Sequence, residues 1–400
     1  MREIGAHQTT DYLRKLTMNK VIVFKSHLLP KSETFIRSQI LSLKNWQYTL
    51  VGLQKINNGL DISDLNIMLL AGHTRLITRC FRLIESLHHK PNKNDVNLLK
   101  SLNADLIHVH FATEAVKYFP LFSSLNIPIL ITLHGFDIRT YKTWWEQGKG
   151  GALMRNYPRN LLALASTSNV HFIAVSESIK RSAVEYGIPE EKVTVNYIGV
   201  DTEQFAPSPN PIQNRKDILF IGRLVEKKGC IYLLKAFKEL QESFPDSKLI
   251  VVGSGPLEHD LIRYSQENHI RAEFVGPQTP EQILAFLATA RIFCLPSITA
   301  DNGDAEGLPI SILEAQACGV PVVTSAKGGN GEGIRDGSSG YSFDEKDVKT
   351  LTKLLAELLL DDKLVKKFSK NARDHITEKM DIRNCSRELE KIYSLHKNRS

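Results

Sequence analysis

The sequence predicts an α/β protein built from two doubly wound, Rossmann-like parallel sheets that face each other across a cleft. Short apolar runs alternate with amphipathic helical stretches along all 400 residues, which is typical of parallel α/β units. This length, with 42% hydrophobic residues, is sufficient for two medium-sized cores. Residues 200–214 contain three prolines and little apolar periodicity, so we expect them to form an interdomain linker.

The linker divides the predicted strands between an N-terminal domain, residues 19–199, and a C-terminal domain, residues 215–380. The predicted strands of the first domain are residues 21–24, 48–53, 105–110, 128–133, 171–175 and 193–197. Those of the second domain are residues 217–221, 248–252, 272–275, 292–295 and 320–324. Residues 381–396 carry apolar side chains at helical spacing, and we expect this last helix to pack back onto the first domain.

Composition narrows the class of protein. The five cysteines are odd in number, far apart and without a CxxC pair, which argues against a disulfide framework or a zinc site and fits a reducing cytoplasm. The N-terminus lacks an apolar core segment, and no run approaches the roughly 20 apolar residues of a membrane span. We therefore expect a cytoplasmic protein that is soluble or peripheral on a membrane.

The net charge of +7 is unevenly distributed. Lysine and arginine outnumber aspartate and glutamate by 24 to 17 in residues 1–205 but equal them, 27 to 27, in residues 206–400. A basic first half suggests an anionic partner, such as phospholipid headgroups, a pyrophosphoryl lipid or nucleic acid. The alternative is a basic surface that serves solubility alone.

Two glutamates, Glu306 and Glu314, bracket a predicted helix start. Proline at the first helical position and the apolar run behind it predict a helix that begins near Pro309. Glu306 then lies on the preceding loop, Glu314 lies in the second turn, and the free amides of residues 308–311 face a ligand. This arrangement suits a diphosphate with hydroxyl groups on both sides, which describes a nucleotide sugar.

Basic side chains follow the first predicted strand of the second domain, in the motif FIGRLVEKKG. Gly222 lets the backbone approach closely, and we expect Arg223 and Lys228 to project into the cleft. A guanidinium and an ammonium in that position can neutralise a departing diphosphate. The alternative is a solvated turn, which is what we expect for Glu226 and Lys227 in the same loop.

A polar cluster also ends a predicted strand of the first domain, in LITLHGFDI. His134 and Asp137 stand at the carboxyl end of a parallel strand, where α/β active sites form. His134 could bond to a sugar hydroxyl or stabilise charge, and Asp137 could orient His134 or the backbone around it. The alternative is that His134 is a structural histidine.

Other motifs are weak or absent. His108 and His110 alternate on one predicted strand without a third ligand, which favours packing near the cleft over a metal site. In VVGSGPLE the third glycine position is Glu258, which argues against a dinucleotide fingerprint. The sequence has no nucleotide-binding GxxxxGK[ST] loop, no GxSxG elbow and no DxD triplet, so we expect no catalytic metal.

The motifs FIGRLVEKKG, VVGSGPLE, EGLPISILEAQACGVPVVTS and GGNGEGIRDGSSGYSF together resemble the retaining family-4 glycosyltransferases of GT-B fold. The motifs LPKSETFIRSQI, DLIHVHF and LHGFDI resemble the branch that builds bacterial exopolysaccharide, colanic acid and O-antigen units on a lipid carrier. The resemblance covers nearly the whole chain. It implies an acceptor-side first domain, a donor-binding second domain and transfer of a hexose from a UDP- or GDP-sugar to a lipid-linked oligosaccharide, without a cofactor.

The resemblance also implies roles for individual residues. The donor diphosphate would be held beside Gly222 by two cations, the helix start would bind phosphate and sugar, and two further groups would contact the transferred sugar. The residues in these roles are Arg223 and Lys228 for the diphosphate, Leu308, Pro309 and Ile310 for the helix start, Glu314 for the ribose, and Glu306 and His134 for the sugar.

The resemblance further implies front-face substitution, in which the departing diphosphate helps to deprotonate the acceptor. A covalent intermediate would need a carboxylate nucleophile, and no residue is cast in that role. One departure from the family is the loop SHLLPKSETF, which lacks the paired glycines that many members carry there. In place of those glycines, the loop offers Ser32, Glu33 and Thr34 for contacts with the acceptor and the sugar.

A basic amphipathic segment, residues 72–90, suggests how an acceptor could reach the cleft. On a helix, Arg75, Arg79 and Arg82 line one face beside an apolar side, a pattern that suits the anionic inner leaflet of a membrane. The alternative is a helix that packs on the first sheet with its arginines in solvent.

Two other functions remain open from the sequence. The same fold could serve a nucleotide-sugar epimerase or a phosphorylase, the latter with pyridoxal phosphate. A non-catalytic nucleotide-sugar-binding scaffold would bind donor without turnover. Nucleic-acid binding has no motif or interleaved aromatic residues to support it.

Overall fold

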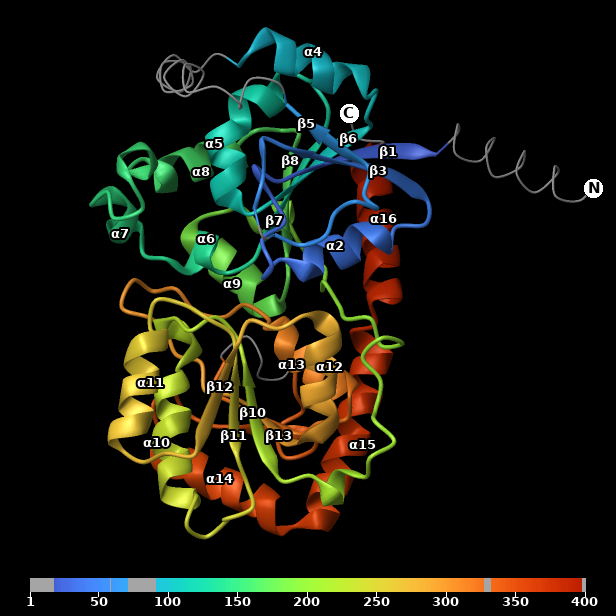
Figure 1. Ribbon diagram of the computed structural model, residues 1–400. Coiled ribbons are helices and arrows are strands. Elements are labelled where there is room, and N and C mark those ends of the chain that lie inside the picture. Colours follow the sequence, from blue (N-terminus) through green and yellow to red (C-terminus); the bar gives the residue numbers. More distant parts are fainter. Residues whose placement is uncertain (1–17, 58, 71–90, 327–331, 398–400) are drawn as a thin grey trace, which may run out of the picture.

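The computed structural model describes residues 18–57, 59–70, 91–326 and 332–397, which form two parallel sheets, one above the other in Figure 1. The upper sheet has seven strands in the order β5-β3-β1-β6-β7-β8-β9. Their bounds are β1 Asn19–Phe24, β3 Trp46–Gly52, β5 Ile67–Leu69, β6 Leu106–His110, β7 Ile129–Leu133, β8 Val170–Ala174 and β9 Val193–Val195. A short pair, β2 His27–Leu28 and β4 Gln54–Lys55, lies beside it.

The lower sheet has six strands in the order β12-β11-β10-β13-β14-β15. Their bounds are β10 Asp217–Ile221, β11 Leu249–Val252, β12 Ala272–Gly276, β13 Ala290–Leu295, β14 Val322–Thr324 and β15 Gly340–Ser342. In both sheets the central strands are buried along their whole length because helices cover both faces.

The helices alternate with the strands along the chain. Those of the first domain are α2 Thr34–Leu41, α4 Lys93–Ser101, α5 Ala112–Ser123, α6 Phe136–Arg139, α7 Lys142–Glu146, α8 Tyr157–Ala165 and α9 Glu177–Tyr186. Those that follow are α10 Cys230–Leu240, α11 Glu258–Glu267, α12 Pro280–Thr289, α13 Ile310–Ala317, α14 Val348–Leu360, α15 Asp362–Lys379 and α16 Ile382–Lys397. Short 3₁₀ turns are η1 Ala152–Met154, η2 Glu190–Lys192, η3 Ile212–Asn214 and η4 Glu226–Lys228.

Each of the eleven predicted strands corresponds to a strand of one of these sheets, with ends that differ by at most two residues. The prediction did not include β2, β4, β5 or β15, which have only two or three residues each. Segments this short are too brief to show an apolar run or an alternation in the sequence. The sheets are therefore larger than the sequence predicted, but only at their edges and in one small pair.

The helix start near Pro309 differs in detail from the prediction. Pro309 is the residue that precedes helix α13, with φ −66° and ψ 121°, so it is not the first helical residue. The helix begins at Ile310, and Glu314 lies in its second turn as expected. The amides of the first turn have no carbonyl partner inside the helix, so this end keeps its capacity to bind an anion.

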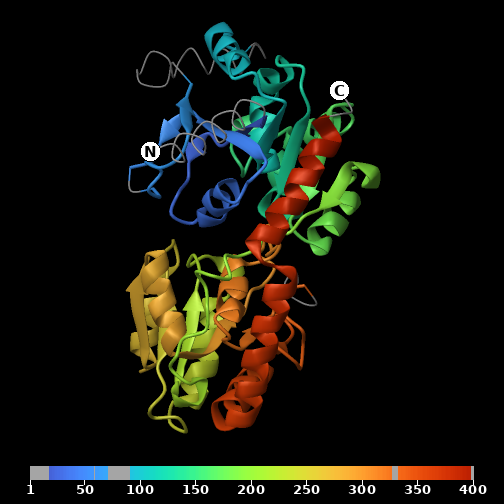
Figure 2. The same ribbon diagram turned by 90° about the vertical axis from the view of Figure 1, so that its right-hand side faces the viewer.

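The last helix, α16, crosses from the second domain to the first and runs along the upper sheet (Figure 2). The Tyr393 hydroxyl lies 2.6 Å from Nδ1 of His108 on β6, and the Tyr393 ring packs edge-on against Trp46. One carboxylate oxygen of Glu390 accepts the backbone N–H groups of residues 44 and 45. The C-terminal segment is thus part of the first domain's core.

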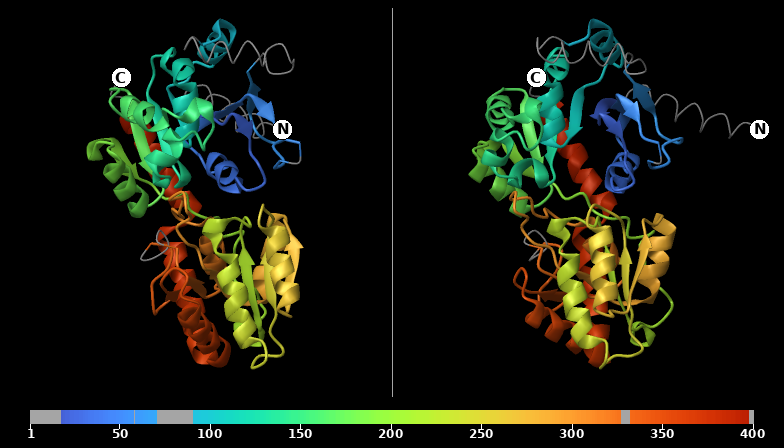
Figure 3. Two further views of the ribbon diagram at one scale, coloured as in Figure 1. Left: turned by 90° about the vertical axis from the view of Figure 1, so that its left-hand side faces the viewer. Right: turned by 60° about the vertical axis from the view of Figure 1, so that its left-hand side comes forward.

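The segment 200–214 joins the two domains (Figure 3). Val200 forms an isolated bridge with Asp381, and Arg373 of α15 donates to the carbonyls of Thr202 and Phe205. The side chain of Phe205 is buried in the core of the second domain. The linker is therefore anchored to the second domain at its start, by Val200, Thr202 and Phe205, whereas most of residues 206–211 are exposed.

Among the helices of the described residues, none is long and apolar enough to cross a membrane. The amphipathic segment 72–90 lies wholly outside the described residues, so both alternatives for it stay predictions. The four cysteines within the described ranges are buried free thiols.

Candidate active site

The strand order places four loops around the cleft between the sheets. In the lower sheet the order reverses beside β10, so the loops after β10 and β13 diverge and leave space at the carboxyl ends of the strands. In the upper sheet the loops after β6 and β7 end at the same edge. The Arg223 to Lys228 loop and Glu306 belong to the lower set, and His134 belongs to the upper one.

Glu306 is a buried carboxylate held by two lysines. Its exposed fraction is 8%, and its Oε1 lies 3.2 Å from Lys228 Nζ and 3.8 Å from Lys227 Nζ. Burial alone would raise the pKa of Glu306, but Lys228 and Lys227 outweigh it and hold the pKa below its ordinary value. The carboxylate is thus ionised at neutral pH although it is removed from water.

Lys227 corrects the sequence prediction, which placed it in a solvated turn. Its Nζ lies 3.1 Å from Asp304 Oδ1, its backbone carbonyl accepts from Ile298 N–H at 2.8 Å, and its side chain is largely covered. Burial opposes its charge, but Glu306 and Asp304 raise its pKa above the ordinary value. The sequence around Lys227 suggests a solvated turn because the carboxylates that pair with it, Asp304 and Glu306, lie 77 and 79 positions further along the chain.

Glycines allow the loop from Arg223 to Lys228 to pack closely against the loops after β11 and β13. A Cβ at Gly222 would come within 3.4 Å of the Lys228 side chain, which crosses over it. Gly229 has φ +64°, and a Cβ there would collide with the Pro296 carbonyl. Gly253 has φ +129° and its Cβ position is occupied by the Gly222 carbonyl. The glycines of VVGSGPLE therefore serve loop packing against the β10 loop.

The other two predicted donor residues stand apart from Glu306. Arg223 is exposed at the end of β10, and Glu314 is half-buried one turn inside α13. Within the described ranges, neither forms an ion pair or hydrogen bond with Glu306. Burial raises the pKa of Glu314 to about 7, which makes it partly protonated at neutral pH.

His134 closes the cleft from the first domain. Its ring packs between Phe111 and Phe35, at centroid distances of 4.3 and 5.1 Å, and its Nε2 lies 3.1 Å from His110 Nδ1. Burial, assisted by His108 and Lys25, lowers the pKa of His134 to about 3. The imidazole is therefore neutral, which suits a hydrogen bond rather than proton donation from an imidazolium.

Asp137 orders the backbone around His134. Its Oδ1 accepts the N–H groups of His134 and Gly135 at 3.1 and 3.0 Å, and its Oδ2 accepts Ala112 N–H from the neighbouring loop at 3.0 Å. Of the two roles expected for Asp137, the structure supports the backbone one. Phe111, beside that loop, has φ +72°, a strained conformation for a residue with a side chain.

His108 and His110 pack against each other inside the first domain, as the sequence analysis favoured. Their rings lie 4.4 Å apart, and His108 lies within hydrogen-bonding distance of Thr132 and Tyr393. Burial lowers the pKa of His108 to about 3. Across the part of the chain that the structure describes, no group of three or more His, Cys, Asp or Glu side chains is arranged to hold a metal ion.

The two domains meet directly beside Glu306. A Cβ at Gly307 would come within 2.6 Å of the His134 carbonyl oxygen, and a Cβ at Gly135 would lie 3.0 Å from the Ala305 carbonyl. Only glycine fits such an approach without displacement. The predicted sugar residues, Glu306 and His134, are therefore brought to the same place from opposite domains.

Charged side chains occupy the loop after β1. In the glycosyltransferases that the sequence resembles, many members carry paired glycines in this loop. Lys25 lies 3.2 Å from Glu33 and 3.4 Å from Glu114, and the hydroxyl of Ser26 donates to Glu114 at 2.7 Å. Burial raises the pKa of Glu33, and Lys25 only partly offsets it. Of the three predicted substitutes in this loop, Glu33 is the one tied into the cluster.

Sequence reasoning missed Lys227, Asp304 and Arg139. Arg139 ends helix α6 and faces the second domain, where Asp304 and Glu306 favour its charge. Its place at the end of a helix of only four residues left no periodic signal in the sequence. Asp304 could have been noticed by its position two residues before Glu306.

Two doubly wound sheets with their strand-end loops facing each other define a GT-B protein. A model described as "Glycosyl transferases group 1" matches residues 201–375, and one described as "Glycosyltransferase Family 4" matches residues 74–204. The two matches overlap at residues 201–204 and together span residues 74–375, so the chain carries both of these glycosyltransferase domains.

Several curated proteins are similar to the chain. A GDP-mannose-dependent alpha-(1-6)-phosphatidylinositol monomannoside mannosyltransferase of Mycolicibacterium smegmatis is 37% identical, over 41% of this chain and 46% of that protein. The amylovoran biosynthesis glycosyltransferase AmsK of Erwinia amylovora is 30% identical, over 65% and 62%. A UDP-Gal:alpha-D-GlcNAc-diphosphoundecaprenol alpha-1,3-galactosyltransferase of Escherichia coli is 27% identical, over 71% and 74%.

A solved structure of Anabaena Alr3699/HepE in complex with UDP-glucose superposes with a TM-score of 0.73, at 17% identity, over 94% of this chain and 99% of that one. At this identity the superposition establishes the fold alone. The chain spans about half the length of the first curated relatives that it matches.

Glu314 gives the site a testable dependence of stability on pH. In the folded state its pKa is about 7, against an ordinary value of 4.5, so the unfolded chain loses this proton first as pH rises. The free energy of unfolding therefore falls between about pH 4.5 and 7, by at most about 3 kcal/mol. We expect Glu314→Gln to be more stable than the wild type at pH 8 and nearly equal to it at pH 4.5, as measured by urea denaturation.

The exposed Glu388, which pairs with Lys391, is the matched control. Its change to glutamine should alter the free energy of unfolding by less than about 0.5 kcal/mol at both pH values. A gain for Glu314→Gln that is the same at pH 4.5 and pH 8 would contradict the raised pKa.

Proposed function

We propose that this protein transfers a hexose from a UDP- or GDP-sugar to a lipid-linked oligosaccharide in the synthesis of a bacterial surface polysaccharide. The observation that carries the proposal is the buried Glu306 carboxylate, paired with Lys228 at the start of α13 and opposite His134. The two glycosyltransferase domains and the printed activities of the relatives support it, and these relatives use different nucleotide sugars. Because these relatives are described as glycosyltransferases, an epimerase, a phosphorylase or a non-catalytic scaffold is less favoured as the function of this protein.

The donor's nucleotide and diphosphate would be held by the second domain. Arg223 and Lys228 supply two cations beside Gly222, and the backbone from Leu308 to Ile310, with the N–H groups of Leu308 and Ile310, adds the positive end of helix α13. Together they would neutralise the charge that develops on the leaving diphosphate. We propose that this cluster makes a divalent metal and any other cofactor unnecessary.

Glu314 would accept the ribose hydroxyls. Since a carboxylate accepts more strongly than a neutral carboxyl group, a donor bound there would favour the ionised form and lower the raised pKa of Glu314. The half-buried position one turn beyond the phosphate-binding end of α13 supports this role.

The transferred sugar would lie between Glu306 and His134. The Glu306 carboxylate can accept sugar hydroxyls, and the neutral His134 imidazole can donate or accept one hydrogen bond at low cost. Both are fixed before the ligand arrives, Glu306 by its lysines and His134 by Phe111 and His110. Such preorganisation avoids reorganisation during the reaction.

We propose retention of the anomeric configuration by front-face substitution. Lys227 and Lys228 compensate the negative charge of the Glu306 carboxylate. This lowers the nucleophilicity of the carboxylate and suits a residue that positions the sugar. The departing diphosphate would take the proton of the acceptor hydroxyl on the same face. No carboxylate in the described part of the site is given the nucleophile's role.

The protein would work in the cytoplasm as a peripheral protein on the inner face of the plasma membrane. The excess of basic residues in the first half of the sequence supports an anionic surface as partner, and no nucleic acid is expected. We expect liposomes with anionic lipid to pellet the protein at low salt and to release it at about 0.5 M salt, where charges are screened. Neutral liposomes are the control, and failure to pellet with anionic ones would contradict the membrane proposal.

A panel of UDP-, GDP- and ADP-sugars tests the activity. We expect slow hydrolysis of one donor without acceptor, and Lys228→Ala should lower kcat for that donor by roughly 10²–10³-fold because it removes a cation from the leaving group. Lys238→Ala removes an exposed lysine on α10, bonded to Asn268, and should leave the rate unchanged. Tight donor binding without turnover of any donor would favour the scaffold instead.

Glu306→Gln tests the mechanism. Front-face substitution predicts that this variant loses activity, by roughly 10²-fold, and that added azide does not restore it. A covalent mechanism predicts rescue by azide with an inverted glycosyl azide as product, because azide would replace the missing nucleophile. Product analysis by NMR distinguishes the two outcomes.

A further inference from the structure

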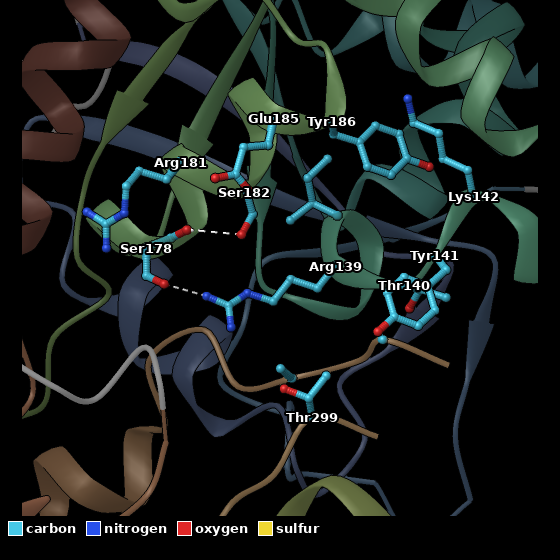
Figure 4. A pocket seen from close by; sticks show the side chains of 13 residues that line it. Arg139, Thr140, Tyr141, Lys142, Ser178, Arg181, Ser182, Glu185, Tyr186 and Thr299 are labelled. Atoms are coloured by element: carbon cyan, nitrogen blue, oxygen red, sulfur yellow. Dashed lines mark hydrogen bonds between the residues drawn. The ribbon is translucent and has the colours of Figure 1, made fainter. Parts of the chain in front are cut away.

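A cavity lies between the domains, beside the loop that carries Asp304 and Glu306. Its volume is about 470 Å³ and it opens to solvent. Helices α6 and α9 of the first domain form one wall, and Thr299, Gly303 and Ala305 of the second domain form the other (Figure 4). None of the residues proposed for the donor lines it.

The cavity is basic. Arg139, Arg181 and Lys142 line it against one carboxylate, Glu185. Within the described ranges, none of the three cations has a carboxylate oxygen within the 4.0 Å of an ion pair. Burial lowers the pKa of Arg139, and Arg181 is close enough to add to this effect, although less strongly than Glu306 and Asp304 oppose it. The lining thus carries three cations against one carboxylate, and such an excess of positive charge suits an anionic ligand.

Two buried polar atoms on the cavity-lining residues also lack partners among the described residues. They are Nε of Arg139 and the hydroxyl of Tyr186. Arg139 is held by one hydrogen bond, 2.5 Å long, to the Ser178 hydroxyl, and Lys142 Nζ lies 4.7 Å from the centre of the Tyr186 ring. Buried donors are usually satisfied, so this deficit is a second sign that the cavity takes a polar ligand.

The cavity adjoins the site of transfer. Ala305, which lines it, directly precedes Glu306, and its carbonyl faces Gly135, the residue after His134. Burial lowers the pKa of Arg139, while Glu306 and Asp304 oppose this effect, so the guanidinium stays charged between the cavity and the site. A ligand in the cavity would therefore lie beside the transferred sugar.

We propose that this cavity binds the phosphate or diphosphate group of the acceptor, with Arg139 and Arg181 as its guanidinium donors and Lys142 at the mouth. This inference rests on the proposed function and adds the acceptor's chemistry to it: an acceptor that carries phosphate near the hydroxyl that is glycosylated. Arg181 is exposed, so its side chain can turn toward a ligand without disturbing the core.

Binding of inorganic pyrophosphate tests the cavity without turnover. The measurement is calorimetric titration of the Arg223→Ala, Lys228→Ala double variant, in which the proposed donor cations are absent. We expect binding to persist there and to weaken roughly tenfold or more when Arg181→Gln is added, because a charge-assisted bond is lost. Lys180→Gln is the matched control: this neighbouring lysine pairs with Glu190, does not line the cavity, and its loss should leave the Kd within twofold.

Equal binding with and without Arg181→Gln, or no binding in the double variant, would overturn the proposal. Farnesyl diphosphate distinguishes the source of the phosphate: competition with pyrophosphate supports an acceptor lipid, whereas pyrophosphate binding without competition indicates a free anion and overturns the acceptor assignment.

Steady-state kinetics connect the cavity to transfer. With a diphosphate-linked acceptor, Arg181→Gln should raise the acceptor KM roughly tenfold with donor KM unchanged. An equal rise in donor KM would assign the cavity to the donor and refute the proposal. If no nucleotide sugar is turned over at all, the proposed function fails, while the titrations still decide whether the cavity binds anions.

Discussion

The ion pairs that hold Glu306 are the interaction on which the site depends. A carboxylate with 8% exposure is costly to ionise unless opposite charges compensate it, and Lys227 and Lys228 do so from a single 3₁₀ turn. The turn that carries these lysines can lie against the loop after β13 only because Gly229 has no Cβ, which would collide with the Pro296 carbonyl. The position of one buried charge therefore depends on the backbone of two loops from neighbouring strands.

The same carboxylate is placed relative to the first domain by contacts between backbones. Gly307 lies against the His134 carbonyl, and Glu332 accepts the N–H groups of Glu177 and Ser178 at the start of α9, at 2.8 and 3.2 Å. An anionic side chain at a helix N-terminus is favourable, so this contact stabilises the arrangement of the two domains. The basic cavity beside Glu306 exists only when the domains adopt this arrangement, because both contribute to its walls.

The long strands of both sheets could be predicted because they are apolar for their whole length, as in β6 and β13. The edge strands β5 and β15, with three residues each, were not predicted. The equally short β9 and β14 were, because each lies within a five-residue stretch that resembles a strand. The helix start at α13 was predicted within one residue, since proline and an apolar run are local signals. In the site, Lys228 and Glu306 stood out through their motifs, whereas Lys227 was misjudged and Arg139 was overlooked.

The sequence by itself determined the two sheets, the linker between them, the helix start beside Glu306 and the kind of charge on each loop. These are local properties, set by the residue types and their spacing. The tertiary structure alone decided which charges meet. Lys227 reaches Asp304 across 77 positions, and the cavity of Arg139 and Arg181 draws its second wall from residues more than 100 positions away. Such contacts depend on how two domains are folded and placed, which spacing along the chain does not encode.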